Sequence, residues 1–161
     1  MRLLHSWPAR VLIAVAFVAA GLGRVALAQA DPFLGTWKLD LAKSTYSPGP
    51  APKSLTVTYS KAGPETKVVV DGVGGDGSKT HWEYTAAVDG KDYKMTGNPD
   101  GDTVSLKQIN PRTVDVTYKR AGKPMLVNRR TLSADGKTLT VTTTGTNAKG
   151  ETVKNVQVFG K

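Results

Sequence analysis

The chain contains no cysteine, and His81 is the only histidine beyond the first 28 residues. The missing thiols exclude a disulfide framework and a thiolate nucleophile. A typical zinc site needs several histidine or cysteine ligands, which His81 cannot supply alone. The base that activates a nucleophile is usually a histidine as well. We therefore expect no catalytic residues, no metal and no cofactor, and we do not expect an enzyme.

Helical periodicity is also missing: beyond residue 30, no apolar repeat of helical spacing runs longer than two turns. Apolar and polar residues instead alternate along short segments, for example 54–60, 81–88 and 113–118. Five Asp-Gly pairs lie between such segments. Asp-Gly supplies the positive φ angles that tight hairpin turns need. The pattern predicts roughly nine or ten short antiparallel strands, joined mostly by hairpins.

Each predicted strand has one apolar face, which the sheet must bury by closing on itself or by stacking on a second sheet. Short hairpin links favour closure. The one long connection, residues 42–53, contains Pro48, Pro50 and Pro52 and is predicted to be an extended loop. The expected fold is all-β, an antiparallel up-and-down barrel of about 8–10 strands.

No apolar run is long enough to span a membrane. The longest, residues 11–20, follows a basic start with Arg2 and Arg10, and Ala26-Leu27-Ala28 has the small-x-small pattern of a cleavage site. We expect a secretory signal peptide over residues 1–28 and one barrel domain over residues 29–161. The mature domain is expected to be periplasmic or secreted and not to span a membrane.

The formal net charge is +9, from 22 basic and 13 acidic residues. A basic balance of this kind can indicate nucleic-acid binding. Here the basic residues are spread along the chain, and export separates the protein from most nucleic acid. We therefore expect no nucleic-acid partner. The oligomeric state is left open.

Residues 71–80 contain the spacing Gly-x-Gly-x-x-Gly at Gly72, Gly74 and Gly77. In a dinucleotide-binding site this motif opens a helix whose N-terminus holds pyrophosphate. The residues that follow, Thr80 to Tyr84, alternate as a strand does. We therefore interpret the segment as a hairpin tip.

The apolar strand faces and two arginines supply the candidate ligand contacts. Inward apolar residues with a few polar groups describe a small-ligand cavity. In residues 125–132 either register of the strand places an arginine among apolar residues, and arginine grips carboxylates in a bidentate fork. Arg129 and Arg130 are therefore alternative anchors. The full candidate set is Trp37, Tyr59, Trp82, Tyr84, Tyr93, Met95, Tyr118, Val127, Arg129 and Arg130.

The segment Phe33-Leu34-Gly35-Thr36-Trp37-Lys38-Leu39 resembles the first-strand signature of fatty-acid-binding proteins and lipocalins, the calycin-type barrels. Residues 152–161 are placed like the last strand of those barrels, and residues 132–139 are similar to the late hairpins of lipocalin-like exported bacterial domains. The resemblance implies a barrel that binds or carries a small hydrophobic or amphipathic molecule. Two features differ: residues 42–53 are rich in proline where fatty-acid-binding proteins have a helical lid, and residues 155–159 lack their Arg-x-Tyr.

The sequence leaves two functions open. The first is an exported barrel that binds a small hydrophobic or amphipathic ligand in its interior, for which an open cavity is expected. The alternative is a non-enzymatic protein-interaction module, such as an inhibitor or an envelope-assembly partner. That alternative predicts a barrel filled by its own side chains with an apolar patch at one rim.

Overall fold

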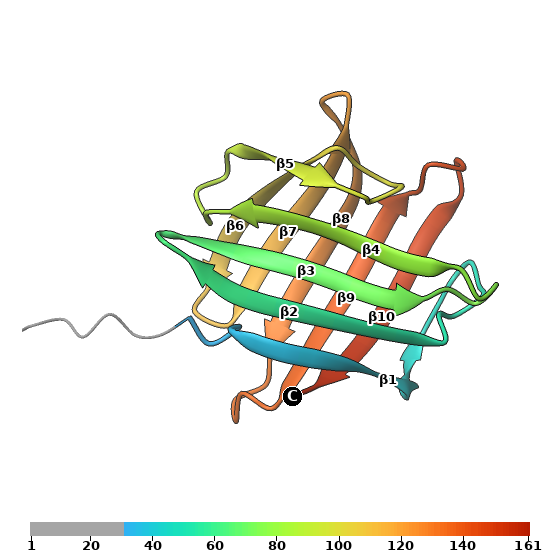
Figure 1. Cartoon of the computed structure of the whole chain (residues 1–161), viewed down its shortest axis with the longest axis horizontal. Helices are drawn as coiled ribbons and strands as arrows, with labels where there is room; N and C mark the ends of the chain where they lie inside the picture. Colours follow the sequence, from blue (N-terminus) through green and yellow to red (C-terminus); the bar gives the residue numbers. More distant parts are fainter. Residues whose placement is uncertain (1–30) are drawn as a thin grey trace, which may run out of the picture.

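The computed structural model describes residues 31–161, which form ten antiparallel strands closed into one barrel (Figure 1). The predicted signal peptide, residues 1–28, lies outside the described residues. No helix that could cross a membrane occurs among residues 31–161. The strands are β1 (Gly35–Thr45), β2 (Ser54–Ala62), β3 (Glu65–Val73), β4 (Lys79–Ala86), β5 (Asp92–Thr96), β6 (Thr103–Asn110), β7 (Thr113–Arg120), β8 (Lys123–Leu132), β9 (Thr138–Thr146) and β10 (Thr152–Gly160).

Every strand pairs with its neighbours in sequence, and β1 pairs with β10 to close the sheet. This arrangement confirms the predicted up-and-down barrel. The predicted hairpin tip is also confirmed, because residues 74–78 link β3 to β4 without a helix. Pairing is extensive between β2 and β3, whereas β4 meets β5 only where Glu83 pairs with Thr96 and Tyr84 with Met95.

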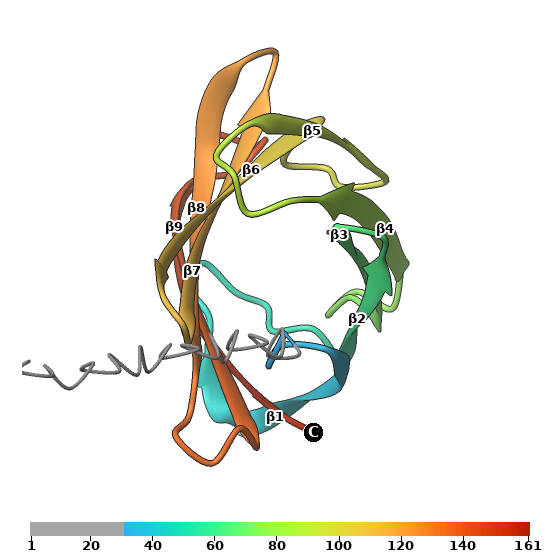
Figure 2. The ribbon, with the colours of Figure 1, turned by 90° about the vertical axis from the view of Figure 1, so that its left-hand side faces the viewer.

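The first strand is longer than the sequence predicts. β1 continues to Thr45, so the proline-rich connection begins at residue 46 rather than at residue 42. An irregularity between Asp40 and Thr45 lets β1 bend and still pair with β10. At the bend the Ser44 hydroxyl donates to the Asp40 carbonyl at 2.7 Å. The prolines therefore occupy only the loop, which passes across part of the far end of the barrel (Figure 2).

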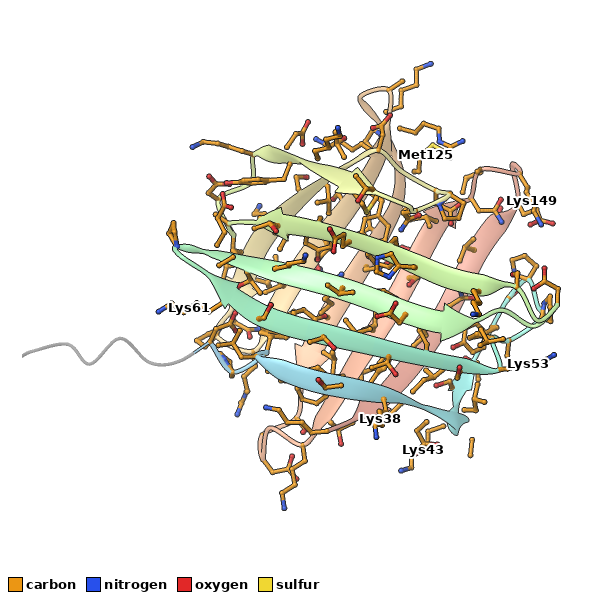
Figure 3. All side chains as sticks on the ribbon, in the orientation of Figure 1. Lys38, Lys43, Lys53, Lys61, Met125 and Lys149 are labelled. Carbon is orange, nitrogen blue, oxygen red and sulfur yellow. The ribbon has the colours of Figure 1, made fainter. Side chains whose placement is uncertain are left out.

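The core fills the interior of the barrel because inward and outward residues alternate along each strand. Trp37, Val104, Val116 and Leu139 are completely buried. Each of them removes a large apolar surface from water, at about 25 cal/mol per Å². The lysines labelled in Figure 3 point outward from different sides of the barrel, in agreement with the spread of basic residues along the sequence.

The two ends of the barrel carry different loops and turns. One end, here called the entry end, carries residues 31–34, which precede β1, together with the β2–β3, β4–β5, β6–β7 and β8–β9 turns. The opposite end, here called the loop end, carries the proline-rich loop, residues 46–53, and the other turns. The Ser47 amide donates to Asn155 Oδ1 at 2.9 Å, which ties this loop to β10.

Candidate functional site

The register of β8 decides which of the two arginines is internal. Arg130 is buried, whereas Val127 and Arg129 lie on the outer face. This placement corrects the expectation that Val127 or Arg129 lines the interior. Arg129 instead donates two hydrogen bonds to the Asp115 carboxylate, at 2.8 and 2.7 Å. These bonds hold the pKa of the Asp115 carboxyl below its usual value.

Arg130 places a positive charge in the interior of the barrel, where it is only 4% exposed. Its guanidinium donates to the Tyr84 hydroxyl at 2.7 Å and to the Tyr118 hydroxyl at 3.1 Å. It also lies over the rings of Tyr59 and Tyr84, 5.6 and 5.9 Å from their centroids. Both contacts stabilise a cation, through hydroxyl oxygens and through aromatic faces.

No carboxylate of residues 31–161 lies within 4.0 Å of this guanidinium. Arginine does not lose its proton in proteins, so the interior carries a full positive charge. Taking such a charge out of water costs several kcal/mol. The neutral tyrosines offset only part of that cost, which leaves Arg130 with a strong attraction for an anion.

The tyrosines around Arg130 form one buried polar network. The Tyr118 hydroxyl also accepts a hydrogen bond from Asn128 Nδ2 at 2.9 Å. Burial raises the pKa of Tyr118 to about 12 and also raises the pKa of Tyr59. Asn128 Oδ1 is buried without a hydrogen-bond partner. A buried polar atom without a partner is unusual, and marks a place where water or a ligand group can add a hydrogen bond.

The other candidates lie around this network. Trp82 stacks on Tyr84 with ring centroids 6.3 Å apart and meets Tyr118 edge to face at 5.8 Å. Trp37 and Met95 are also buried in the interior. Tyr93 is half-buried at the entry end, where its hydroxyl donates to Asp89 at 3.1 Å. The interior thus brings together Trp37, Tyr59, Trp82, Tyr84, Tyr93, Met95, Tyr118 and Arg130.

A narrow space, here called the inner gap, lies beside Arg130 near the entry end. Its volume is about 30 Å³, and its walls include Phe33, Tyr59, Val114 and Arg130. That volume is close to the share of one water molecule in liquid water. Asp31 lines the same gap, so an acidic and a basic side chain both border it. The space beside Arg130 is therefore small in this conformation.

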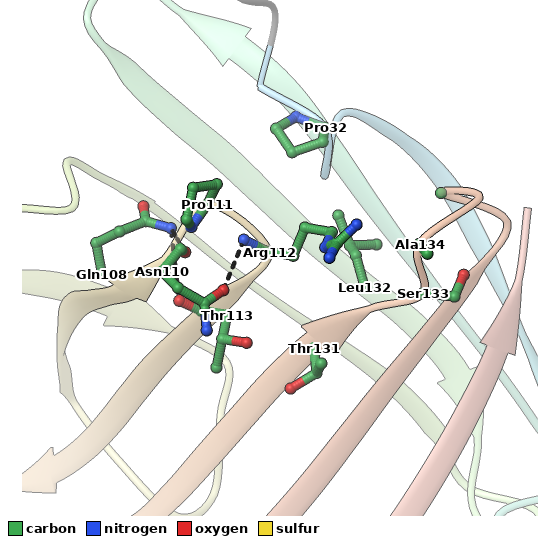
Figure 4. A pocket seen from close by; sticks show the side chains of 11 residues that line it. Pro32, Gln108, Asn110, Pro111, Arg112, Thr113, Thr131, Leu132, Ser133 and Ala134 are labelled. Carbon is green, nitrogen blue, oxygen red and sulfur yellow. Dashed lines mark hydrogen bonds between the residues drawn. The ribbon is translucent and has the colours of Figure 1, made fainter.

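A much larger depression, here called the vestibule, opens at the same end (Figure 4). Its volume is about 1060 Å³. Its wall includes Asn110 at the end of β6, together with Pro111 and Arg112 of the β6–β7 turn. Leu132 and Pro32 line it from β8 and from the segment before β1. Figure 4 shows Arg112 between Pro111 and Leu132. Apolar and polar groups therefore share this surface.

Sequence reasoning missed the vestibule and Asp31. Arg112 follows Asn110-Pro111, a pattern that only indicated a turn, and nothing in the sequence brings that turn close to Pro32. Asn128 was recognisable only after the register of β8 was fixed, because it shares the inward face with Arg130. Asp31 precedes β1, where no strand pattern indicates its position.

No group of three or more histidine and acidic side chains within residues 31–161 is placed to hold a metal ion. His81 is 62% exposed on the outer face, and its Nδ1 lies 2.6 Å from Asp71 Oδ1. The chemistry of the interior is that of hydrogen bonding and charge.

No family model and no curated protein sequence matches this chain. Among solved structures, the chain is similar to zebrafish ileal bile acid-binding protein, crystallised with cholic acid. The two chains are 12% identical, with a TM-score of 0.49, and the match covers 81% of this chain and 98% of the other. The fold is established by the strand pairing itself: a ten-stranded, closed, up-and-down barrel.

Proposed function

We propose that this barrel binds a small amphipathic anion, whose charged group reaches Arg130 and whose body lies in the vestibule. The observation that carries the proposal is a buried guanidinium with no carboxylate partner among residues 31–161. Replacing a buried charge by well-packed apolar residues is often neutral or stabilising, so stability alone gives little reason for this arginine. A ligand anion gives it a function.

The geometry of Arg130 suits a carboxylate or a similar anion. A guanidinium has five N–H donors, and the bonds to Tyr84 and Tyr118 occupy two of its nitrogens. The remaining donors are available to a ligand, and those bonds are charge-assisted. Phe33 and Val114 supply apolar walls at the same place. The anionic group would therefore enter dry surroundings, where electrostatic attraction is strong.

The vestibule suits the body of the ligand. Its volume of about 1060 Å³ lies just above the range that is usual for small-molecule sites, about 300–1,000 Å³. Leu132, Pro32 and Pro111 offer apolar contacts, while Gln108 and Arg112 offer polar ones. A molecule that is apolar in part and polar in part matches this lining better than a plain hydrocarbon does. Binding or transport, rather than catalysis, agrees with an interior made of arginine, tyrosine and asparagine.

The test is a calorimetric titration of the protein with laurate and with dodecanol, which share a chain length but differ in charge. We expect laurate to bind more tightly. In Arg130→Met the affinity for laurate should fall roughly 10- to 100-fold, since a hydrogen bond to a charged group contributes about 1.5–3 kcal/mol. Arg129→Met is the matched control on the outer face and should bind as the unaltered protein does. Equal affinities of Arg130→Met and unaltered protein for laurate would contradict the proposal.

The small volume of the inner gap favours a second candidate function, a module that docks a protein partner at the entry end. Val88 and Ile109, which flank this end, are exposed by 41% and 45%. Such a module would bind neither laurate nor dodecanol. It would instead lose its partner when Val88 or Ile109 is replaced by lysine, in a pull-down from the exported fraction.

A further inference from the structure

We propose that residues Asp31–Leu34 form a gate that separates the vestibule from Arg130 and opens by rotation at Gly35. The inference rests on the proposed function, because a gate matters only if a ligand has to reach Arg130. It concerns how the ligand enters.

The segment forms a wall between the two spaces. Pro32 lines the vestibule, whereas its neighbours Asp31 and Phe33 line the inner gap beside Arg130. Three consecutive residues thus face two different cavities. Moving them would join the vestibule to the inner gap.

The size of the inner gap makes some movement necessary. About 30 Å³ accommodates roughly one water molecule, and a carboxylate with its attached carbon is larger. The other walls of the gap belong largely to strands that pair on both sides, such as those of Tyr59 and Val114. The segment before β1 and Val88 of the β4–β5 turn lie outside the paired strands, so these parts of the wall move at a lower cost than the strands do.

Two hydrogen bonds and the Phe33 side chain, which is buried in the core, hold the segment shut. The Thr66 hydroxyl donates to Asp31 Oδ2 at 3.3 Å, which links the segment to β3. Trp37 Nε1 donates to the Phe33 carbonyl at 2.8 Å, and the Phe33 ring lies 6.2 Å from the Tyr59 ring. The bonds from the Phe33 and Leu34 amides to Asp31 are internal, so they can move with the segment.

Gly35 provides the hinge. Its φ is +122°, a conformation that other residues rarely adopt, and a Cβ at this position would approach Lys161 Cε to 2.8 Å. Pairing with β2 begins at this residue, where Gly35 lies opposite Tyr59. Rotation at Gly35 can therefore swing Asp31–Leu34 away and leave the closed barrel intact.

The absence of cysteine allows a direct test. The double variant Asp31→Cys/Thr66→Cys, purified from the exported fraction, places two thiols at the positions of the Thr66–Asp31 hydrogen bond. These are joined by oxidation or by a short bifunctional thiol reagent, and the rates of laurate binding and release are followed by stopped-flow tryptophan fluorescence. We expect both rates to fall at least 10-fold in the joined form and to recover on reduction of the disulfide. The single variants should not respond to oxidant.

A second variant tests the gate without a cross-link. Phe33→Ala removes the side chain that lies between the inner gap and Tyr59, so both rates should rise several-fold. Unchanged rates in the cross-linked form, with laurate still bound by the reduced form, would overturn the gate and leave the proposed function standing. Failure of the reduced form and of unaltered protein to bind laurate would overturn both.

Discussion

The guanidinium of Arg130 on β8 donates a 2.7 Å hydrogen bond to the hydroxyl of Tyr84 on β4, so the two side chains join strands that are not neighbours in the sheet. The bond is buried, and its donor carries a charge. Hydrogen bonds of this kind are among the stronger ones in proteins. It therefore both fixes the position of Arg130 and ties one wall of the barrel to another.

The first prediction concerns this bond. Tyr84→Phe should lower the free energy of unfolding by about 2 kcal/mol, because a buried charged donor loses its acceptor. In the Arg130→Met background, Tyr84→Phe should lower the free energy of unfolding by less. The double-mutant cycle should therefore give a coupling energy between Tyr84 and Arg130 of at least about 1 kcal/mol. Urea denaturation measures all four proteins. Tyr93→Phe, whose hydroxyl bonds Asp89 at the rim, is the control and should change stability by less than about 0.5 kcal/mol. Additive effects of the Tyr84 and Arg130 substitutions would show that the bond contributes nothing.

The second prediction concerns alkaline pH. Burial raises the pKa of Tyr118 from 10.0 to about 12. Below pH 10 both the folded and the unfolded chains keep this proton, and above pH 10 the unfolded chain loses it first. The free energy of unfolding should therefore decrease as pH rises from 10 to 12, and Tyr118 should contribute about 2–3 kcal/mol of that decrease.

Denaturation curves of the protein and of Tyr118→Phe across this pH range provide the measurement. The variant should lose less stability than the unaltered protein between the two pH values. Tyr46→Phe is the control, since Tyr46 is less buried and should give a smaller difference. Identical pH profiles for the protein and Tyr118→Phe would show that Tyr118 ionises as an exposed tyrosine does.

The third prediction concerns the close approach of β8 and β9. Gly145 has φ +134°, and a Cβ there would collide with the Met125 carbonyl oxygen and approach Leu126 Cα to 3.0 Å. Gly145→Ala should destabilise the barrel by about 3 kcal/mol or more, because strain and overlap add. Gly136 has φ +68° with no atom within 4 Å of such a Cβ, so Gly136→Ala should cost only about 1–2 kcal/mol. Thermal or urea unfolding ranks the two variants, and the reverse order would contradict this account of β8 and β9.

The fold was predictable because its signals are local. Alternation with a period of two and Asp-Gly turns indicate strands and hairpins independently of the rest of the chain. Hairpins then imply the order of the strands, and the apolar faces imply closure. The end of β1 was not predictable in the same way, because the bend between Asp40 and Thr45 breaks the alternation while pairing with β10 continues.

The site was predictable only in part. The aromatic residues follow from alternation, since each shares the apolar face of its strand. The choice between Arg129 and Arg130 depends on the register of β8, and a shift of one residue exchanges the two. In the register that the structure shows, Arg130 points inward and Arg129 pairs with Asp115 on the outer face. Asp31 and Arg112 reach the entry end through the closure of the barrel, which no local pattern specifies.

The most direct measurement follows the side-chain N–H resonances of Arg130 by NMR during titration with laurate, with dodecanol as the uncharged control. Arg130→Met identifies the resonances by their loss. The account predicts that laurate shifts these signals strongly, that dodecanol does so weakly, and that the Arg129 signals stay in place. Saturating laurate that leaves the Arg130 signals unmoved would contradict the claim that Arg130 holds the anionic group of the ligand.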